Sequence, residues 1–192
     1  GVTKFKIGDR AGITPLLEAC QKCQYCLEGK EYLCESSVIT GESFKGGYTE
    51  YITVHENFAT LIPNTMKAEY AAPLFCAGIT AYKAVKAAEP KQHKKIGIFG
   101  IGGVGHMAIQ FAKVENCNVI AFSRTQNHLD VAKRLGADDA IKFLENQEEF
   151  LKILKEKHGT LDAAIVFAPA DIVTDTAIKS VKKGGLIVIA TV

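Results

Sequence analysis

The chain has 192 residues, of which 47% are hydrophobic and 23% are charged, and its net charge is +2. The basic residues are scattered, and no apolar run approaches the roughly 18 residues that cross a bilayer, so we expect neither nucleic acid nor a membrane as partner. No secretory signal is recognisable, and a cytoplasmic globular protein is expected.

The first part of the chain consists of short segments that resemble strands and are separated by turns. The chain opens on GVTKFKIGDR and closes on GGLIVIATV, and both segments look like strands. A chain bounded in this way is expected to be an excised piece of a longer protein, with a processed or tagged start as the alternative. Further along, Gly46-Gly47 precede the β-branched and aromatic run 48–54, whose residue types suit a pleated sheet.

Four of the six cysteines lie between positions 20 and 34. Such clustering without a secretory signal favours a metal over disulfides. The short gaps let a tight turn bring sulfurs together, and the longer gap lets the fourth cysteine close a tetrahedron. Four thiolates leave no vacancy for substrate, so we predict a structural zinc site that folds a loop. The ligands are Cys20, Cys23, Cys26 and Cys34.

Two alternatives to zinc remain for these cysteines. An iron–sulfur cluster of the bacterial ferredoxin type would favour three residues before the fourth cysteine and a proline after it, whereas seven residues and Glu35 are present here. Four unliganded thiols are the second alternative.

From about residue 67, apolar strands alternate with amphipathic helices. Helix-length crossovers between strands that are buried on both faces imply a doubly wound parallel sheet. Gly136 suits the left-handed residue that ends one of these helices. Five of the usual six strands are found, which favours C-terminal truncation. The expected strands are 95–99, 118–123, 139–143, 163–167 and 186–190, with helices around 104–111, 129–135, 150–158 and 173–181 between them.

The run Gly100-Ile101-Gly102-Gly103-Val104-Gly105 lies between the first parallel strand and the following helix. This placement turns a weak G-x-G-x-x-G signal into a strong prediction of a dinucleotide site. Gly100 permits a tight turn, Gly102 lets backbone approach a pyrophosphate, and Gly105 allows close helix packing. Gly103 and Val104 open the helix, whose first N–H groups face the anion. A glycine turn without ligand is the alternative.

The end of the second parallel strand indicates which dinucleotide is bound. An acid there would hold the ribose hydroxyls and repel a 2′-phosphate, but the sequence has Ser123, Arg124 and Thr125. The nearest acid, Asp130, is expected on the next helix. A hydroxyl followed by a guanidinium suits a phosphate, which favours NADP. NAD with a solvated Arg124 is the alternative, and His106 lies either near the phosphates or in a structural role.

Over nearly its whole length the chain resembles the medium-chain, zinc-dependent alcohol dehydrogenases. The combination looks closest to microbial alcohol dehydrogenases or to the cinnamyl-alcohol-type NADP enzymes. The resemblance implies part of a GroES-like, mainly β catalytic domain over 1–66, with its zinc lobe at 20–34, and a truncated Rossmann-type domain over 67–192. The matching stretches are GVTKFKIGDR, EACQKCQYCLEGKEYLC, GGYTEYITV, AAPLFCAGITAY and IGIFGIGGVGHMAIQFAK.

The resemblance assigns further roles. Cys76 matches a catalytic zinc ligand on the helix that leads into the coenzyme domain, and Thr80, one helical turn later, matches a residue beside the nicotinamide. Without the resemblance Cys76 would be a small buried hydrophobe, and Cys117 keeps that interpretation. The other catalytic ligands, a cysteine and a histidine with an adjacent glutamate, would lie upstream, and neither His55 nor His93 replaces them.

The resemblance implies reversible oxidation of an alcohol to an aldehyde or ketone in the full-length protein, with zinc as Lewis acid and NAD(P) as hydride carrier. One cysteine cannot build a catalytic zinc site, so this chain alone is expected to be inactive. The expected partners are a nicotinamide dinucleotide and a small alcohol or aldehyde, and the full-length protein is expected to be a homo-oligomer. The alternatives are a zinc-free quinone or enone reductase, a polyol or threonine dehydrogenase, and a non-catalytic NADP-binding fragment.

Overall fold

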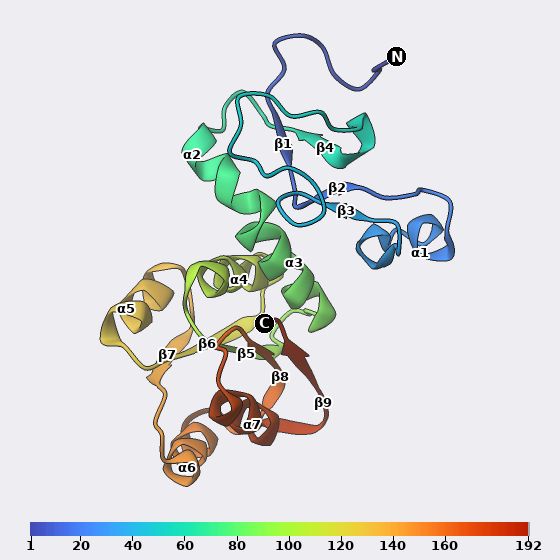
Figure 1. Ribbon diagram of the computed structural model, residues 1–192. Helices are drawn as coiled ribbons and strands as arrows, with labels where there is room; N and C mark the ends of the chain where they lie inside the picture. The colour runs from blue at the N-terminus through green and yellow to red at the C-terminus, as the bar shows by residue number, and fades with distance from the viewer. Residues whose placement is uncertain (192) are drawn as a thin grey trace. The chain divides into compact units, whose positions relative to one another are not determined.

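The computed structural model describes residues 1–191, which form two compact units (Figure 1). The first unit is Gly1–Cys76 and the second begins at Ala77. The division falls ten residues beyond the expected domain boundary at residue 66. Within the described chain, every helix is too short or too polar to cross a membrane.

The first unit is built from two small antiparallel pairs of strands. β1 (Ala11–Ile13) pairs with β4 (Ala59–Leu61), and β2 (Leu16–Glu18) pairs with β3 (Val38–Ile39). The ring of Phe75 lies directly against Gly12, where any Cβ would overlap it. The remaining elements are α1 (Gln24–Leu27), η1 (Glu31–Leu33), η2 (Glu56–Phe58), α2 (Ala68–Ala71) and η3 (Ala72–Phe75).

Two strands expected in this unit are absent from the described residues. The run 48–54 is irregular backbone, and Tyr48 and Tyr51 are almost fully exposed. Its side chains still alternate between exposed and half-buried beyond Tyr51, but no neighbouring strand pairs with it, and a strand requires such a partner. Residues 1–10 are also irregular, and the backbone N–H groups of Thr3 and Lys4 donate to the carboxylate of Glu56, each at 2.8 Å, instead of to a neighbouring strand. Both predictions of a strand are therefore wrong.

The second unit is a five-stranded parallel sheet with the strand order β7-β6-β5-β8-β9. Helices cover both of its faces, so the predicted doubly wound architecture is confirmed (Figure 1). Three helices pack on one face and two on the other. The strands are β5 (Lys95–Phe99), β6 (Asn118–Ser123), β7 (Asp139–Lys142), β8 (Leu161–Val166) and β9 (Val181–Ile189). The helices are α3 (Ala77–Ala87), α4 (Gly103–Val114), α5 (Gln126–Arg134), α6 (Gln147–His158) and α7 (Asp171–Ser180).

The two faces of the sheet have different cores. Alanines dominate the helices on the α3–α4–α5 face, and they pack against Ile96 and Ile98 of β5. On the α6–α7 face, the rings of Phe99 and Phe122 stack with centroids 4.4 Å apart, and Phe150 lies edge-on to Phe122 at 5.3 Å. Such aromatic pairs add about 0.5–1.5 kcal/mol each beyond their area burial. Because side chains alternate along β5, this strand contributes apolar side chains to the cores on both faces of the sheet.

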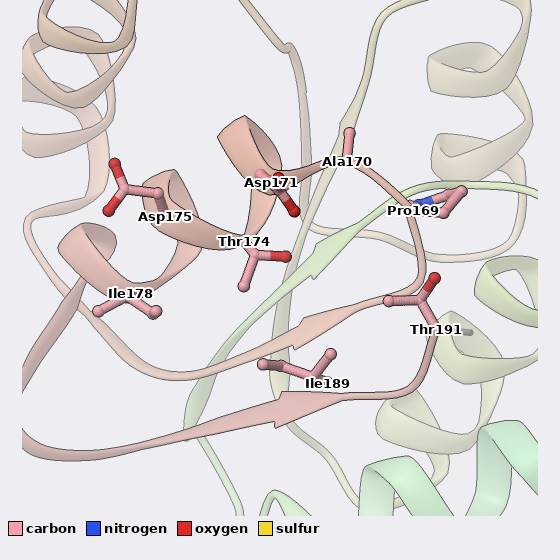
Figure 2. Close-up of a pocket in the computed structure, with 8 residues that line it drawn as sticks. All are labelled: Pro169, Ala170, Asp171, Thr174, Asp175, Ile178, Ile189 and Thr191. Carbon is pink, nitrogen blue, oxygen red and sulfur yellow. The ribbon is translucent and has the colours of Figure 1, made fainter.

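An open hollow borders the edge of the sheet, between α7 and the end of β9 (Figure 2). It has a volume of about 530 Å³. Asp171 and Asp175 contribute carboxylates, Ile178 and Ile189 contribute apolar surface, and the described residues that line it include no cation. This lining does not suit a phosphate ligand.

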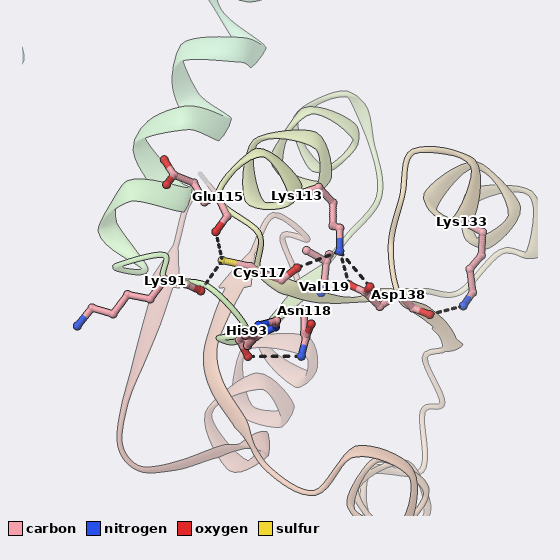
Figure 3. Close-up of polar contacts among 9 residues, drawn as sticks. All are labelled: Lys91, His93, Lys113, Glu115, Cys117, Asn118, Val119, Lys133 and Asp138. Carbon is pink, nitrogen blue, oxygen red and sulfur yellow. Dashed lines mark hydrogen bonds and ion pairs between the residues drawn. The ribbon is translucent and has the colours of Figure 1, made fainter.

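Hydrogen bonds and an ion pair hold the ends of α4 and α5 at the amino side of the sheet (Figure 3). Gly136, with a φ of 99°, ends α5 as predicted, and its N–H donates to the carbonyl of Lys133. Lys113 at the end of α4 pairs with Asp138 at 2.8 Å and also donates to the carbonyl of Cys117. Asp138 accepts the N–H of Val119 at 2.7 Å, so the turns before β6 and β7 are joined.

Candidate metal centre and dinucleotide site

The four clustered cysteines converge in the loop between β2 and β3. Their sulfur atoms all lie within 4.8 Å of one another, and those of Cys20 and Cys26 are 3.9 Å apart. A tetrahedral zinc ion with bonds of about 2.3 Å to sulfur would set its ligands about 3.8 Å apart. The donor set therefore fits a structural zinc ion, as the spacing predicts.

Local backbone turns position each sulfur. Cys20 follows β2, Cys23 begins α1, Cys26 lies within it, and Cys34 ends η1. The helices α1 and η1 bury none of their side chains, although Cys34 itself is 4% exposed. A loop without an apolar core of its own depends on a bound ion to hold its shape.

Hydrogen bonds in the cluster favour the thiolate form at one position. The backbone N–H groups of Lys22 and Cys23 lower the pKa of Cys20 to about 6. Burial raises the pKa of Cys26 to about 12, and hydrogen bonding to Cys23 adds to this increase. The backbone N–H of Cys20 also donates to Sγ of Cys34 at 3.5 Å. Metal binding requires deprotonated thiols, so a divalent cation would displace the protons that these sulfurs carry.

The glycine turn lies at the junction of β5 and α4, where the sequence predicts it. Gly100 has a φ of 96°, and a Cβ there would lie 2.9 Å from the backbone nitrogen of Ala168. A Cβ on Gly105 would overlap the carbonyl oxygen of Gly100, so the helix packs closely against the turn. Gly102 has open space around it. The turn therefore leaves one glycine free to meet a ligand while the other two permit the packing.

A hollow of about 310 Å³ lies beside this turn, at the carboxyl ends of the strands. The turn forms one wall, the loop after β6 forms a second, and the loop after β8 forms a third. The strand order reverses between β5 and β8, and ligands of such sheets bind in the crevice at this reversal. Gly103 and Val104 open α4, and the N-cap Gly102 has no side chain to cap its N–H groups. These groups can bind an anion.

The end of β6 and the residue after it combine a buried hydroxyl with an exposed guanidinium. Ser123 is 8% exposed, and Arg124 is exposed. Asp130 lies on α5, as expected, and accepts a hydrogen bond from Gln126 at 2.8 Å. Sequence analysis missed His128, whose Nδ1 lies 3.3 Å from Oγ of Ser123 and which also lines the hollow. Its position one turn into a helix after the strand end is the signal that could have identified it.

His106 lies in the first turn of α4 and is half-buried. Its Nε2 atom is buried and has no hydrogen-bond partner among the described residues. Its ring lies edge-on to that of His128, with centroids 6.3 Å apart. Burial lowers the pKa of His106, and the nearby His128 lowers it further.

Cys76 is exposed and lies between η3 and α3. It therefore precedes the first residue of the helix, which corrects its expected place on that helix. Thr80 is exposed on α3, in the second unit. In the described part of the chain, the four-cysteine cluster is the group of three or more metal-binding side chains, and Cys76 is outside it. Cys117 is fully buried, and burial raises the pKa of its thiol.

Neither His55 nor His93 belongs to a group of three or more possible metal ligands in the described residues. His55 accepts the N–H of Asn57 through Nδ1 at the start of η2. His93 lies in the loop before β5 with a φ of 64°.

Comparisons with known proteins agree with this arrangement. Residues 1–64 match the alcohol dehydrogenase GroES-like domain, and residues 103–192 match the zinc-binding dehydrogenase family. An alcohol dehydrogenase from Geobacillus stearothermophilus is 41% identical over 98% of this chain and 56% of its own length. The chain thus spans little more than half the length of this curated relative.

Two solved structures have the same fold. One is an NAD-dependent alcohol dehydrogenase with 30% identity and a TM-score of 0.87, matched over 98% of this chain and 55% of its own. The other is a protein named CAD from Helicobacter pylori, complexed with NADP(H), with 28% identity and a TM-score of 0.84. The match covers 98% of this chain and 54% of the length of CAD.

Proposed function

Because this chain belongs to the zinc-dependent, medium-chain alcohol dehydrogenase family, we propose that the whole protein transfers hydride between a small alcohol and a nicotinamide dinucleotide. The observation that carries this proposal is the open glycine turn between β5 and α4, beside a hollow at the reversal of strand order. The chemistry of hydride transfer belongs to the dinucleotide, and the protein binds and orients it.

In this proposal the second unit holds the dinucleotide. The first N–H groups of α4 bind the pyrophosphate, and Gly102 leaves space for it. Ser123 and Arg124 bind the adenosine ribose and its substituent, and Thr80 lies beside the nicotinamide. The four-cysteine zinc has no open position, so its role is to fold the loop that carries it.

A catalytic zinc ion would polarise the alcohol oxygen as a Lewis acid. We propose Cys76 as one of its ligands, on the basis of the motif around it. Such a site needs three protein ligands, and Cys76 belongs to no group of three or more possible ligands among the described residues. We therefore expect that the 192-residue chain by itself does not oxidise alcohols, and turnover of a primary alcohol by the purified chain would contradict this.

We propose NADP as the preferred dinucleotide. The hydroxyl of Ser123 and the guanidinium of Arg124 can donate to a 2′-phosphate, and the described residues that line their hollow include no carboxylate. The two solved relatives are named with NAD in one case and NADP(H) in the other, so the proposal depends on these residues. The substitution Ser123→Asp should shift the affinity ratio towards NAD, and an unchanged ratio would contradict the assignment.

Dinucleotide binding itself is tested with Gly102→Asp. The site is open, so the fold is retained, but a carboxylate roughly 5 Å from a phosphate costs about 3 kcal/mol at an effective dielectric of 20. Calorimetric affinity for NADP and NAD should fall about a hundredfold. Gly47→Asp is the matched control, because Gly47 also has open space and lies in the other unit. If both variants and the native chain bind the dinucleotide with equal affinity, the dinucleotide does not bind at the glycine turn.

A zinc-free quinone or enone reductase is the alternative within the same superfamily. The convergence of four cysteine sulfurs within 4.8 Å favours the zinc-dependent branch. A cytoplasmic location and homo-oligomeric assembly of the full-length protein remain predictions.

A further inference from the structure

The turn that begins the metal loop (residues 20–34) contains a residue in an unfavourable backbone conformation. Gln21 directly follows the first cysteine and has a φ of 59°, in the left-handed region that residues with a side chain seldom adopt. This turn brings the backbone N–H of Cys23 to 3.3 Å from Sγ of Cys20. A residue other than glycine persists in such a conformation only where the surrounding structure holds it. The turn therefore requires a contact that keeps Gln21 in place.

The side chain of Gln21 makes such a contact with a residue 36 positions further along the chain. Its Oε1 atom accepts a hydrogen bond from Nδ2 of Asn57, which lies in η2, at 2.5 Å. Oδ1 of Asn57 accepts a hydrogen bond from Nζ of Lys4, also at 2.5 Å. A lysine ammonium can only donate, so it faces the amide oxygen of Asn57. The amide nitrogen of Asn57 is thereby directed towards Gln21.

We propose that Gln21 and Asn57 are positioning residues of the metal centre, which hold the first cysteine turn in the conformation that binds zinc. The inference depends on the zinc site of the four cysteines and is independent of the dinucleotide site. The helices α1 and η1 of the metal loop bury none of their side chains, so packing does little to order the loop. A loop that is ordered before the ion arrives loses less conformational entropy on binding it. Zinc affinity therefore depends on Asn57, a side chain outside the ligand set.

The contact also transmits the effect of zinc in the opposite direction, because coupling between two sites is reciprocal. The backbone N–H groups of Thr3 and Lys4 donate to the carboxylate of Glu56, which precedes Asn57. Zinc that fixes Gln21 also fixes Asn57 and the η2 turn that carries Glu56. Binding of zinc should therefore slow hydrogen exchange at the N–H groups of Thr3 and Lys4.

Competition with a chromophoric chelator measures the contribution of the contact to zinc affinity. Asn57→Ala removes the amide, and zinc should bind about fivefold more weakly, since one net hydrogen bond changes an equilibrium by about this factor. Both Gln21 and Asn57 are exposed, so the fold is retained. Gln24→Ala is the matched control, because it removes an exposed amide that donates to Glu28 within the metal loop, at 2.9 Å. Its zinc affinity should stay within about twofold of the native value.

A conservative variant distinguishes the hydrogen bond from a loss of packing. In Asn57→Asp the carboxylate still accepts from Lys4, and the amide of Gln21 can turn and donate to it through Nε2. Zinc affinity should therefore be at least that of the native chain. An affinity as low as that of Asn57→Ala would contradict a role for this hydrogen bond.

Gln21→Gly separates the side-chain contact from the backbone conformation. Glycine adopts a φ of 59° without steric cost, so this variant keeps the turn and loses the amide. Asn57→Ala should weaken zinc binding in the native background and have no further effect in Gln21→Gly, because the contact is already absent there. The protection of Thr3 and Lys4 by zinc should also be lost in Gln21→Gly.

The outcomes separate this inference from the proposed function. If Asn57→Ala leaves zinc affinity unchanged, or weakens it equally in both backgrounds, the positioning role is refuted while the metal centre stands. Protection of Thr3 and Lys4 by zinc that persists in Gln21→Gly would also refute it. If the native chain binds no zinc, the inference and the metal centre both fail, and the dinucleotide site is judged separately by its own titrations.

Discussion

The close contact between α4 and the glycine turn can be tested by adding a single methyl group. A Cβ on Gly105 would overlap the carbonyl oxygen of Gly100, and backbone cannot move aside as a flexible side chain can. Overpacking costs up to about 3 kcal/mol, and the higher helix propensity of alanine returns about 1 kcal/mol. Gly105→Ala should therefore destabilise the second unit by about 2 kcal/mol.

Urea unfolding followed by far-ultraviolet circular dichroism measures this effect. With a slope of about 2 kcal/mol per molar, the midpoint should fall by about 1 M. Gly102→Ala is the matched control, because nothing lies within 4 Å of its Cβ position, and its stability should change by less than about 0.5 kcal/mol. Equal midpoints for the two variants would refute the packing role of Gly105.

Two further predictions concern the metal lobe and acid stability. Cys34→Ser should reduce zinc from one ion per chain to near none and expose the lobe to proteases, while Cys76→Ser keeps the ion; a folded native chain without zinc would contradict this. Burial alone raises the pKa of Asp139, but hydrogen bonds from Lys133 and His158 outweigh it and lower the pKa to about 2. Because the unfolded carboxyl titrates near about 3.9, this stabilisation of about 1–2 kcal/mol is present above that pH and is lost as pH falls towards 2. In Asp139→Asn the free energy of unfolding should depend less on pH in this range, as measured by acid titration in fixed urea. A pH dependence equal to that of the native chain would exclude the ion pair.

The second unit could be predicted closely because its signals are local. The bounds of β5 and β6 match the predicted strands at both ends. In these segments buried apolar runs, amphipathic helices and glycine punctuation all indicate the same structure. β9 begins at Val181, five residues before the predicted start, because it continues through the irregular pairing next to Leu161.

The first unit could not be predicted to the same extent, because strands depend on distant partners. Tyr51 and its neighbours have the composition of a strand, yet the described residues supply none to pair with them. The cysteine cluster could be predicted, because the short gaps between the cysteines in the sequence bring their sulfur atoms together. His128 was not, because its contact with Ser123 arises only when the start of α5 folds back over the end of β6.

Amide chemical shifts of the chain during titration with NADPH test the dinucleotide site most directly. The largest changes should occur at the N–H groups of Gly103, Val104 and Gly105, where the first turn of α4 would bind the pyrophosphate. Changes concentrated around Asp171 and Ile189, in the hollow between α7 and β9, or no changes at saturating ligand, would contradict the account.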